Sequence, residues 1–140
     1  MRYISCVVGD LTIESYQPLL PPSSKQLVYI AGPISAPLES MRKANVAVAE
    51  TACVGLLQMG YSIYCPHTMT SGFTIYEYEA GLTYETWMEQ ARCVIPRCDL
   101  ICMLPGWAKS RGAREEYNLA ATEGHPILYA RRKRRHEDED

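Results

Sequence analysis

A carboxylate stands one turn into a segment that has the pattern of a helix start. Ser110, Gly112 and Glu116 follow an apolar run that ends in Leu104-Pro-Gly106. Serine is a common N-cap, glycine lets the backbone approach a ligand, and Glu116 falls one turn after Gly112 on the same helix face. Loops beyond the carboxyl ends of parallel strands line the ligand crevice of α/β proteins. Glu116 is therefore a candidate catalytic carboxylate.

The adjacent pair Glu115 and Glu116 also has a purely structural explanation. Acidic side chains near a helix N-terminus complement its positive end, and acidic first turns are common. From the spacing alone, this second explanation is favoured over catalysis.

The elements that must position this carboxylate alternate between strand and helix. Short apolar runs bounded by Gly or Pro predict strands, and apolar residues at three- and four-residue spacing predict helices. The predicted strands are Leu27 to Ala31, Tyr61 to Cys65, Leu100 to Leu104 and Ile127 to Ala130, and the predicted helices are Leu38 to Met59, Thr83 to about Ile95 and Ser110 to Glu123. This alternation predicts an α/β fold with a mainly parallel sheet and helices on both faces.

Three segments lie outside this alternation. Residues 1–24 carry β-branched and aromatic residues around Gly9-Asp10 before a Pro-rich break, which predicts an arm or short hairpin ahead of a domain at 25–130. Residues 131–140 are a basic run followed by an acidic run; they cannot bury apolar surface and are predicted to be a disordered tail. Pro66 to Leu82 is predicted to be a long loop, of the kind that is usually functional or mobile.

The charge balance favours small molecules or proteins as partners. The 140 residues fit one domain, and 14 Lys+Arg against 16 Asp+Glu give a formal net charge of −2. This small net charge therefore gives no indication that the partner is a nucleic acid or an anionic membrane. The basic run in the tail can bind phosphate, but the adjacent acidic run can neutralise it, so a solvated tail is favoured over a nucleic-acid patch.

The cysteines predict neither disulfides nor a metal site. None of the six forms a C-x-x-C motif, and we interpret them as buried free thiols in a reducing cytoplasm. Cys98 and Cys102 are spaced to share one strand face, but no second pair completes a zinc site. No cofactor is predicted. Without an 18-residue apolar run or a charged-then-apolar leader, neither a membrane span nor a signal peptide is predicted.

Two separated motifs together resemble a known enzyme superfamily. Val28-Tyr-Ile-Ala-Gly-Pro-Ile34 is followed much later by Cys98-Asp99, Leu104-Pro-Gly-Trp107, Ser110-Arg-Gly-Ala113, Glu116 and Ala120. The combination resembles the nucleoside 2-deoxyribosyltransferase-like superfamily, in particular its small DUF4406-like branch of uncharacterised bacterial and phage proteins. The resemblance runs from about Leu27 to Ala130.

The resemblance implies a fold and a reaction. The fold would be a flavodoxin-like three-layer sandwich with its core strands in the order 2-1-3-4. In the superfamily, Ser-x-Gly-x-x-x-Glu carries the glutamate that attacks C1′ of a nucleoside and forms a glycosyl-enzyme ester, and the matching residue here is Glu116. Water as the second acceptor makes a hydrolase, and a second base makes a transferase. The resemblance also implies a homodimer or higher homo-oligomer, with sites near subunit interfaces.

The same resemblance implies roles for residues near the glutamate. Tyr29 and the turn Gly32, Pro33, Ile34 and Ser35 would line the sugar side, and Tyr29 would orient the glutamate; a half-buried strand tyrosine is an equal alternative. Ser110, Arg111 and Gly112 would hold a hydroxyl or a 5′-phosphate, against the alternative of a helix cap and a solvated cation.

Three further side chains are weaker candidates. His67 follows the second strand and would touch ligand from the crevice, although a lone loop histidine is more often a surface residue. Trp87 and Trp107 have the chemistry to stack on a base, but tryptophan also packs in cores, and we favour core packing for Trp107.

One position departs from the superfamily pattern. The superfamily usually carries an aspartate eight residues before the strand-opening Asp, which here is Asp99, and that position holds Ala91. Alanine cannot transfer a proton, so general-acid assistance, commonly about 10²–10⁴-fold, must come from another group or be absent. The alternative to an enzyme is therefore a protein that binds a nucleotide, to sense or sequester it, without turnover.

Overall fold

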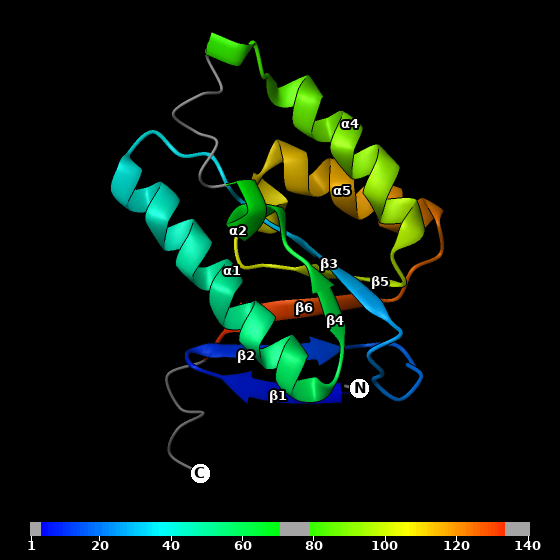
Figure 1. Ribbon diagram of the computed structural model, residues 1–140. Helices are drawn as coiled ribbons and strands as arrows, with labels where there is room; N and C mark the ends of the chain where they lie inside the picture. Colours follow the sequence, from blue (N-terminus) through cyan, green and yellow to red (C-terminus); the bar gives the residue numbers. More distant parts are fainter. Residues whose placement is uncertain (1–3, 71–78, 134–140) are drawn as a thin grey trace.

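The computed structural model describes residues 4–70 and 79–133 as an α/β fold built on one six-stranded sheet (Figure 1). The strands are β1 (Ile4–Val8), β2 (Leu11–Ser15), β3 (Leu27–Ala31), β4 (Ser62–Tyr64), β5 (Leu100–Met103) and β6 (Ile127–Arg132). The helices are α1 (Glu39–Met59), α2 (Pro66–Thr70), α4 (Tyr84–Val94) and α5 (Arg111–Thr122), with short 3₁₀ helices at Ile95–Arg97 and Trp107–Lys109.

The sheet is mixed, so the expectation of a mainly parallel sheet is wrong. Its order is β1-β2-β6-β5-β3-β4. The four strands predicted from the sequence are the parallel part, paired β4 to β3, β3 to β5 and β5 to β6. The other two strands extend this part in the antiparallel sense, because β2 pairs with β6 and β1 pairs with β2.

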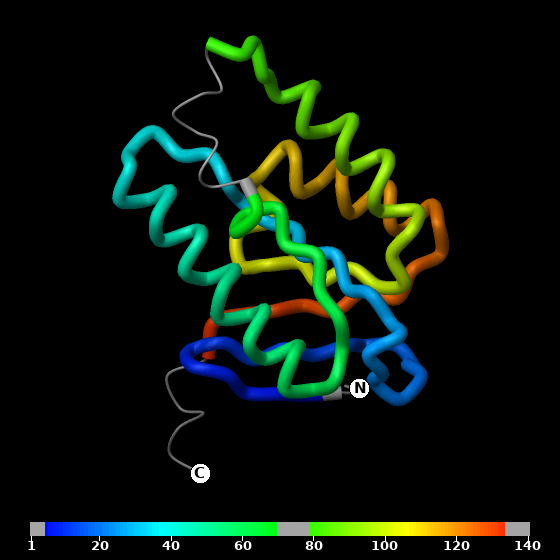
Figure 2. Tube along the Cα trace, in the orientation of Figure 1, coloured from blue at the N-terminus to red at the C-terminus, as the bar shows by residue number. Residues whose placement is uncertain are grey.

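The two antiparallel strands come from the segment that the sequence assigned to an arm or hairpin. They form a hairpin around Gly9, which adopts a positive φ of 56°. Leu11 and Ile13 of β2 are completely buried in the main core, so the hairpin is part of the domain's sheet. Figure 2 shows this N-terminal segment beside β6, although the two are far apart in the sequence.

Two hydrophobic clusters, one on each face of the sheet, hold the helices in place. On one face, Ala52 and Leu56 of α1 pack with Val28 and Ile30 of β3. On the other face, α4 and α5 pack against Ile101 and the rest of a second cluster. Neighbouring residues of one strand alternate between the two clusters because successive side chains point to opposite sides of a sheet.

The helix boundaries follow local signals that the sequence displays. Gly60 ends α1 with a positive φ of 105°, and its N–H reaches the carbonyl of Leu56. Thr83 and Thr86 form a reciprocal capping box at the start of α4. Ser110 is the N-cap of α5, where its side chain accepts a hydrogen bond from the N–H of Ala113.

Other boundaries differ from the sequence prediction. Residues 66–70 of the predicted loop are the helix α2, and residues 71–78 lie outside the described residues. Strand β6 continues through Arg132, beyond the predicted end at Ala130, because Arg131 pairs at 2.9 Å with the buried carboxylate of Glu14 on β2. Residues 134–140 of the predicted tail lie outside the described part of the chain.

The cysteine predictions are only partly right. All six thiols are free, but only four are buried: Cys93 is exposed and Cys6 is half-buried. Cys98 and Cys102 belong to different clusters on opposite faces of the sheet, because β5 begins only at Leu100 and Cys98 precedes the strand.

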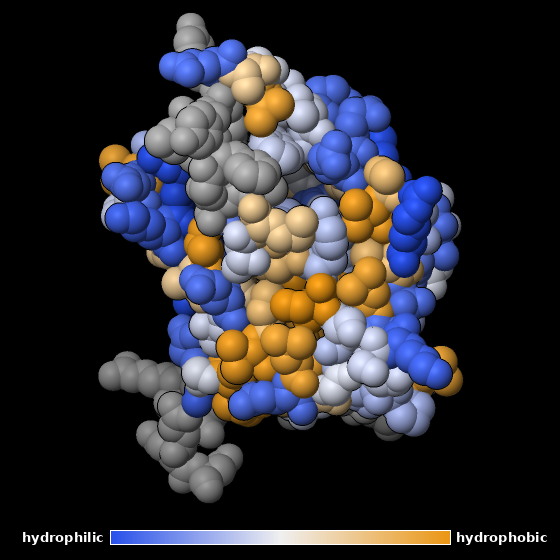
Figure 3. Space-filling model, in the orientation of Figure 1, coloured by the Kyte–Doolittle hydropathy of each residue, from blue (hydrophilic) through white to orange (hydrophobic). Residues whose placement is uncertain are grey.

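The surface carries apolar side chains near the hairpin. Figure 3 shows hydrophobic residues gathered over the lower middle of the face that it draws. The exposed large hydrophobic residues include Val7 of β1 and Val54 and Leu57 of α1. Among the described residues, no helix combines the length and the apolar character needed to cross a bilayer.

Candidate functional site

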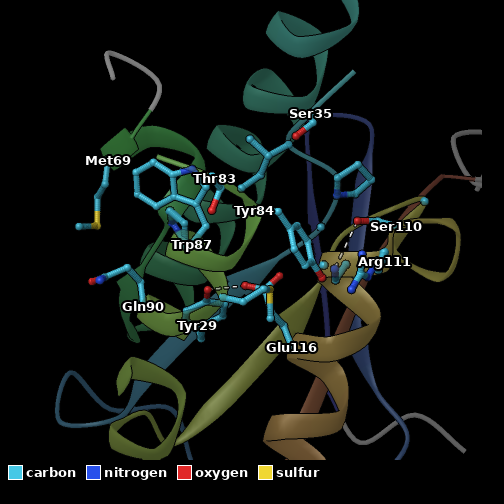
Figure 4. A pocket seen from close by; sticks show the side chains of 18 of the residues that line it. Tyr29, Ser35, Met69, Thr83, Tyr84, Trp87, Gln90, Ser110, Arg111 and Glu116 are labelled. Carbon is cyan, nitrogen blue, oxygen red and sulfur yellow. Dashed lines mark hydrogen bonds between the residues drawn. The ribbon is translucent and has the colours of Figure 1, made fainter. Parts of the chain in front are cut away.

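A cavity of about 860 Å³ opens where the chain leaves the carboxyl ends of β3 and β5 (Figure 4). Its walls come from the turn after β3, from α2 and α4, and from the start of α5. Most of the residues singled out from the sequence line it: Tyr29, Gly32, Pro33, Ile34, Ser35, Trp87, Ser110, Arg111, Gly112 and Glu116. Adjacent parallel strands explain this convergence, since their carboxyl ends meet at one edge of the sheet.

Glu116 lies on the buried side of α5 and reaches the cavity. Its side chain accepts a hydrogen bond from the hydroxyl of Tyr29, and the residue is only 9% exposed. Burial raises the pKa of Glu116 to about 7, although the hydrogen bond from Tyr29 and the nearby His67 act in the opposite direction. A carboxylate with a pKa near 7 can change its protonation state at physiological pH.

Tyr29 is held so that its hydroxyl faces the carboxylate. Its ring stacks on that of Tyr64, with the centroids 5.7 Å apart and the planes 17° from parallel. Burial and the neighbouring Glu116 both raise the pKa of Tyr29 well above its ordinary value, so the phenol keeps its proton. A neutral phenol donates one hydrogen bond, and here that bond fixes the orientation of Glu116.

The two adjacent glutamates occupy different environments. Glu115 lies on the outer side of α5, where its carboxylate accepts a hydrogen bond from Arg111 at 3.3 Å. The Arg111 guanidinium lies 4.6 Å from the centre of the Tyr84 ring. Glu115 lies beyond the first turn of α5, so the explanation of an acidic first turn does not apply to it; it forms an exposed ion pair with Arg111, whereas Glu116 lines the cavity.

The turn after β3 depends on a glycine. A Cβ atom at Gly32 would come within 2.6 Å of the Cβ of Leu104, a separation that real Cβ atoms essentially never show. Only glycine lets this turn pass so close to the end of β5. Gly112 is less constrained, because a Cβ there would meet the Tyr84 ring at an ordinary 3.6 Å.

His67 does not line the cavity, contrary to the expectation that it touches ligand. Its ring is 1% exposed on α2, and Nε2 lies 3.0 Å from the carbonyl oxygen of Pro33. A carbonyl oxygen only accepts, so Nε2 carries the proton. His67 therefore supports the turn that forms one wall of the cavity.

The α4 wall contains residues that the sequence interpretation missed. Tyr84, Met88 and Gln90 line the cavity beside Trp87, and Tyr64 and Met69 complete this side. For Tyr84 and Met88, helical spacing was the available signal in the sequence, since both share one helix face with Trp87. Trp107 instead stacks on Tyr117 with ring centroids 4.9 Å apart, as core packing predicts.

Ala91 lies on the buried side of α4. It is 2% exposed and belongs to the same apolar cluster as Tyr29 and Met88. An alanine side chain contributes packing at this position and offers no proton. Among the described residues that line the cavity, Glu116 is the only carboxylic acid.

Comparison with known families places the chain in one of them. The family described as "Domain of unknown function (DUF4406)" matches residues 26–129, and the chain belongs to this family. The match covers β3, β4, β5, the first half of β6 and the cavity, but not the N-terminal hairpin. No curated protein and no solved structure matches the chain.

Proposed function

We propose that this member of the DUF4406 family cleaves or transfers the N-glycosidic bond of a nucleoside or nucleoside 5′-monophosphate, with Glu116 as the nucleophile. The observation that carries the proposal is the buried Glu116 carboxylate, oriented by Tyr29 at the floor of a cavity of about 860 Å³. The sequence resemblance to the nucleoside 2-deoxyribosyltransferase-like superfamily, with its flavodoxin-like fold, supports the same assignment.

The chemistry requires an ionised Glu116. One carboxylate oxygen attacks C1′ while the C1′–N bond breaks, and the electron pair of that bond leaves with the base. The product is a glycosyl ester of Glu116. Water or a second base then attacks C1′, and the ester C–O bond breaks to restore the carboxylate. The hydroxyl of Tyr29 keeps one carboxylate oxygen oriented throughout.

The cavity has the size and character of a small-molecule site. Ligand pockets commonly span about 300–1,000 Å³ and combine apolar walls with a few polar groups. Trp87 and Met88 supply apolar surface on one side, and the serines at 35 and 110 supply hydroxyls elsewhere in the lining. A nucleoside has matching parts, since its base is flat and its sugar carries hydroxyl groups.

Release of free base from a panel of nucleosides and their 5′-monophosphates tests the proposal directly. We expect chromatography to show at least one member converted to free base, with release proportional to protein concentration. Conversion only in the presence of a second base would identify a transferase. Binding of panel members without any base release would instead favour the alternative function, a nucleotide-binding protein without turnover. Ala91 and the absence of a second carboxylic acid among the described lining residues also favour this alternative.

We expect a nucleoside 5′-monophosphate to bind about ten- to a hundred-fold more tightly than its nucleoside, because the α5 N-terminus and Arg111 face the cavity. Calorimetric titration with a matched pair measures this ratio. The variant Arg111→Met is the control, and it should reduce the preference. Equal affinities, or tighter binding of the nucleoside, would refute a phosphate site at this end of the cavity.

We also propose that the protein forms a homodimer or higher homo-oligomer, as the resemblance implies. The exposed apolar residues Val54 and Leu57 on α1 are compatible with a surface that a second copy covers.

A further inference from the structure

The two ends of the cavity differ in chemistry, with Glu116 between them. Figure 4 shows Met69, Trp87 and Gln90 together on one side and Ser110 and Arg111 on the other. The first side offers an indole, a thioether and an amide. The second offers a hydroxyl, a cation and the N-terminus of α5. The side with Met69, Trp87 and Gln90 is called the α4 side below. A base would therefore lie against the α4 side, with its sugar carbon C1′ over Glu116.

Among the described residues that line the cavity, no carboxylic acid other than Glu116 and no histidine is present to protonate a departing base. Apart from Glu116, the ionisable residues that line the cavity in the described part of the chain are Tyr29, Tyr64, Tyr84, Lys109 and Arg111. Tyr29 already donates to Glu116. An arginine is not deprotonated in proteins, and a phenol, with an ordinary pKa near 10, is a weaker proton donor than the carboxylic acid and imidazolium groups that commonly protonate a leaving base. Lys109 is exposed and immediately precedes Ser110, at the other end of the cavity.

The lack of a second carboxylic acid or a histidine among the described lining residues divides substrates into two classes. An uncharged purine or pyrimidine leaves its sugar as an anion unless it is protonated, and general-acid assistance is commonly worth about 10²–10⁴-fold. A base that carries a permanent positive charge leaves as a neutral molecule and needs no proton. A site with a nucleophile and no strong general acid therefore favours the second class.

We propose that the substrate is a nucleoside or nucleotide whose base is a cationic aromatic ring, with a pyridinium carboxamide as the best fit. This inference rests on the proposed function. Glu116 attacks C1′ as the bond from C1′ to the ring nitrogen breaks, and the electron pair of that bond neutralises the ring. Water then attacks C1′, the ester to Glu116 breaks, and the proton from water passes to solvent.

The α4 side has the groups that recognise such a ring. Indole faces attract cationic rings, and thioether sulfur makes favourable contacts with aromatic rings. Gln90 is exposed where it lines the cavity, and its side-chain amide can pair with a carboxamide through one donor and one acceptor. The negative charge of Glu116 adds attraction for the cation before the bond breaks.

Guanosine and 7-methylguanosine form a matched pair that isolates the charge of the base, and nicotinamide riboside tests the pyridinium carboxamide. We expect the full-length protein to release base from 7-methylguanosine and nicotinamide riboside at least about 100-fold faster than from guanosine. Each rate is taken after subtraction of the rate with Glu116→Gln protein, which removes the intrinsic lability of the charged compounds.

The kinetic constants of a Gln90 variant test the role of this residue separately. In the variant Gln90→Leu, we expect KM for nicotinamide riboside to rise about ten-fold with little change in kcat, because one amide pair is lost. The same variant should leave KM unchanged for N-ribosylpyridinium, which has no carboxamide. A general loss of folding would instead lower kcat for both compounds, and equal effects on both KM values would overturn the assignment of Gln90.

The outcomes separate this inference from the proposed function. Glu116-dependent cleavage of guanosine, adenosine or uridine at a rate equal to that of the charged substrates would overturn the inference and leave the proposed function intact. Failure to cleave any compound, charged or neutral, would overturn both. Selective cleavage of the charged bases would support both.

Discussion

Replacing Glu116 by glutamine is expected to lower base release by at least about 10³-fold, because the carboxylate is the proposed nucleophile. Glutamine has nearly the same shape and still accepts a hydrogen bond from Tyr29, so the cavity should persist. Single-turnover assays with the best substrate measure the loss. In the wild-type protein, kcat/KM should rise with pH through about 7, because burial raises the pKa of Glu116 to that value and only the ionised form attacks.

Glu115→Gln is the matched control for this experiment. It removes the same charge from the neighbouring residue of the same helix, where the carboxylate pairs with the exposed Arg111. Its effect on base release should be small. Equal losses in both variants, or substantial activity in the Glu116 variant, would show that Glu116 is not the nucleophile.

The contribution of Glu116 to the free energy of unfolding should fall as pH rises from about 4.5 to about 7. Burial raises the pKa of Glu116 from 4.5 to about 7, so in this window the folded state holds a proton that the unfolded state has released. The Glu116 contribution to the free energy of unfolding therefore decreases with pH, and the penalty is complete above the folded-state pKa. It amounts to about 3 kcal/mol.

Comparison with Glu116→Gln measures this penalty. We expect the variant to unfold with nearly the same free energy as the wild type near pH 4 and to be more stable by about 3 kcal/mol at pH 8. Urea denaturation of both proteins across this range gives the difference, and Glu115→Gln serves again as the control. A difference between wild type and Glu116→Gln that does not change with pH would show that Glu116 titrates normally in the folded protein.

Local sequence signals predicted the elements that carry the site. The strand Leu27–Ala31 has the bounds predicted for it, and Gly60 ends α1 because a left-handed terminal residue favours glycine. Ser110 was recognisable as an N-cap, and it does accept the hydrogen bond expected of one. Such features depend on a few neighbouring residues, so the sequence alone is sufficient to predict them.

Other features depended on contacts between distant segments. Strand β2 pairs with β6 through residues more than a hundred positions apart, and nothing local in residues 1–24 distinguishes a free hairpin from one that extends the sheet. The continuation of β6 beyond Ala130 follows from the same pairing, since Arg131 meets Glu14 only when the two strands are adjacent. In the sequence alone, the basic run that begins at Arg131 has no visible partner, and it therefore suggested a disordered tail.

The sequence by itself determined the strands at 27–31 and 100–103 and the motifs that follow them, because neighbouring residues encode both. The tertiary structure pairs β3 with β5 and so brings the two motifs to one edge of the sheet. Only the tertiary structure decided what each residue does there. Glu115 and Glu116 are chemically identical, and α5 buries one and leaves the other facing water and Arg111. That difference in solvation, set by how the helix packs against the sheet, raises the pKa of Glu116 and separates a candidate nucleophile from a surface carboxylate.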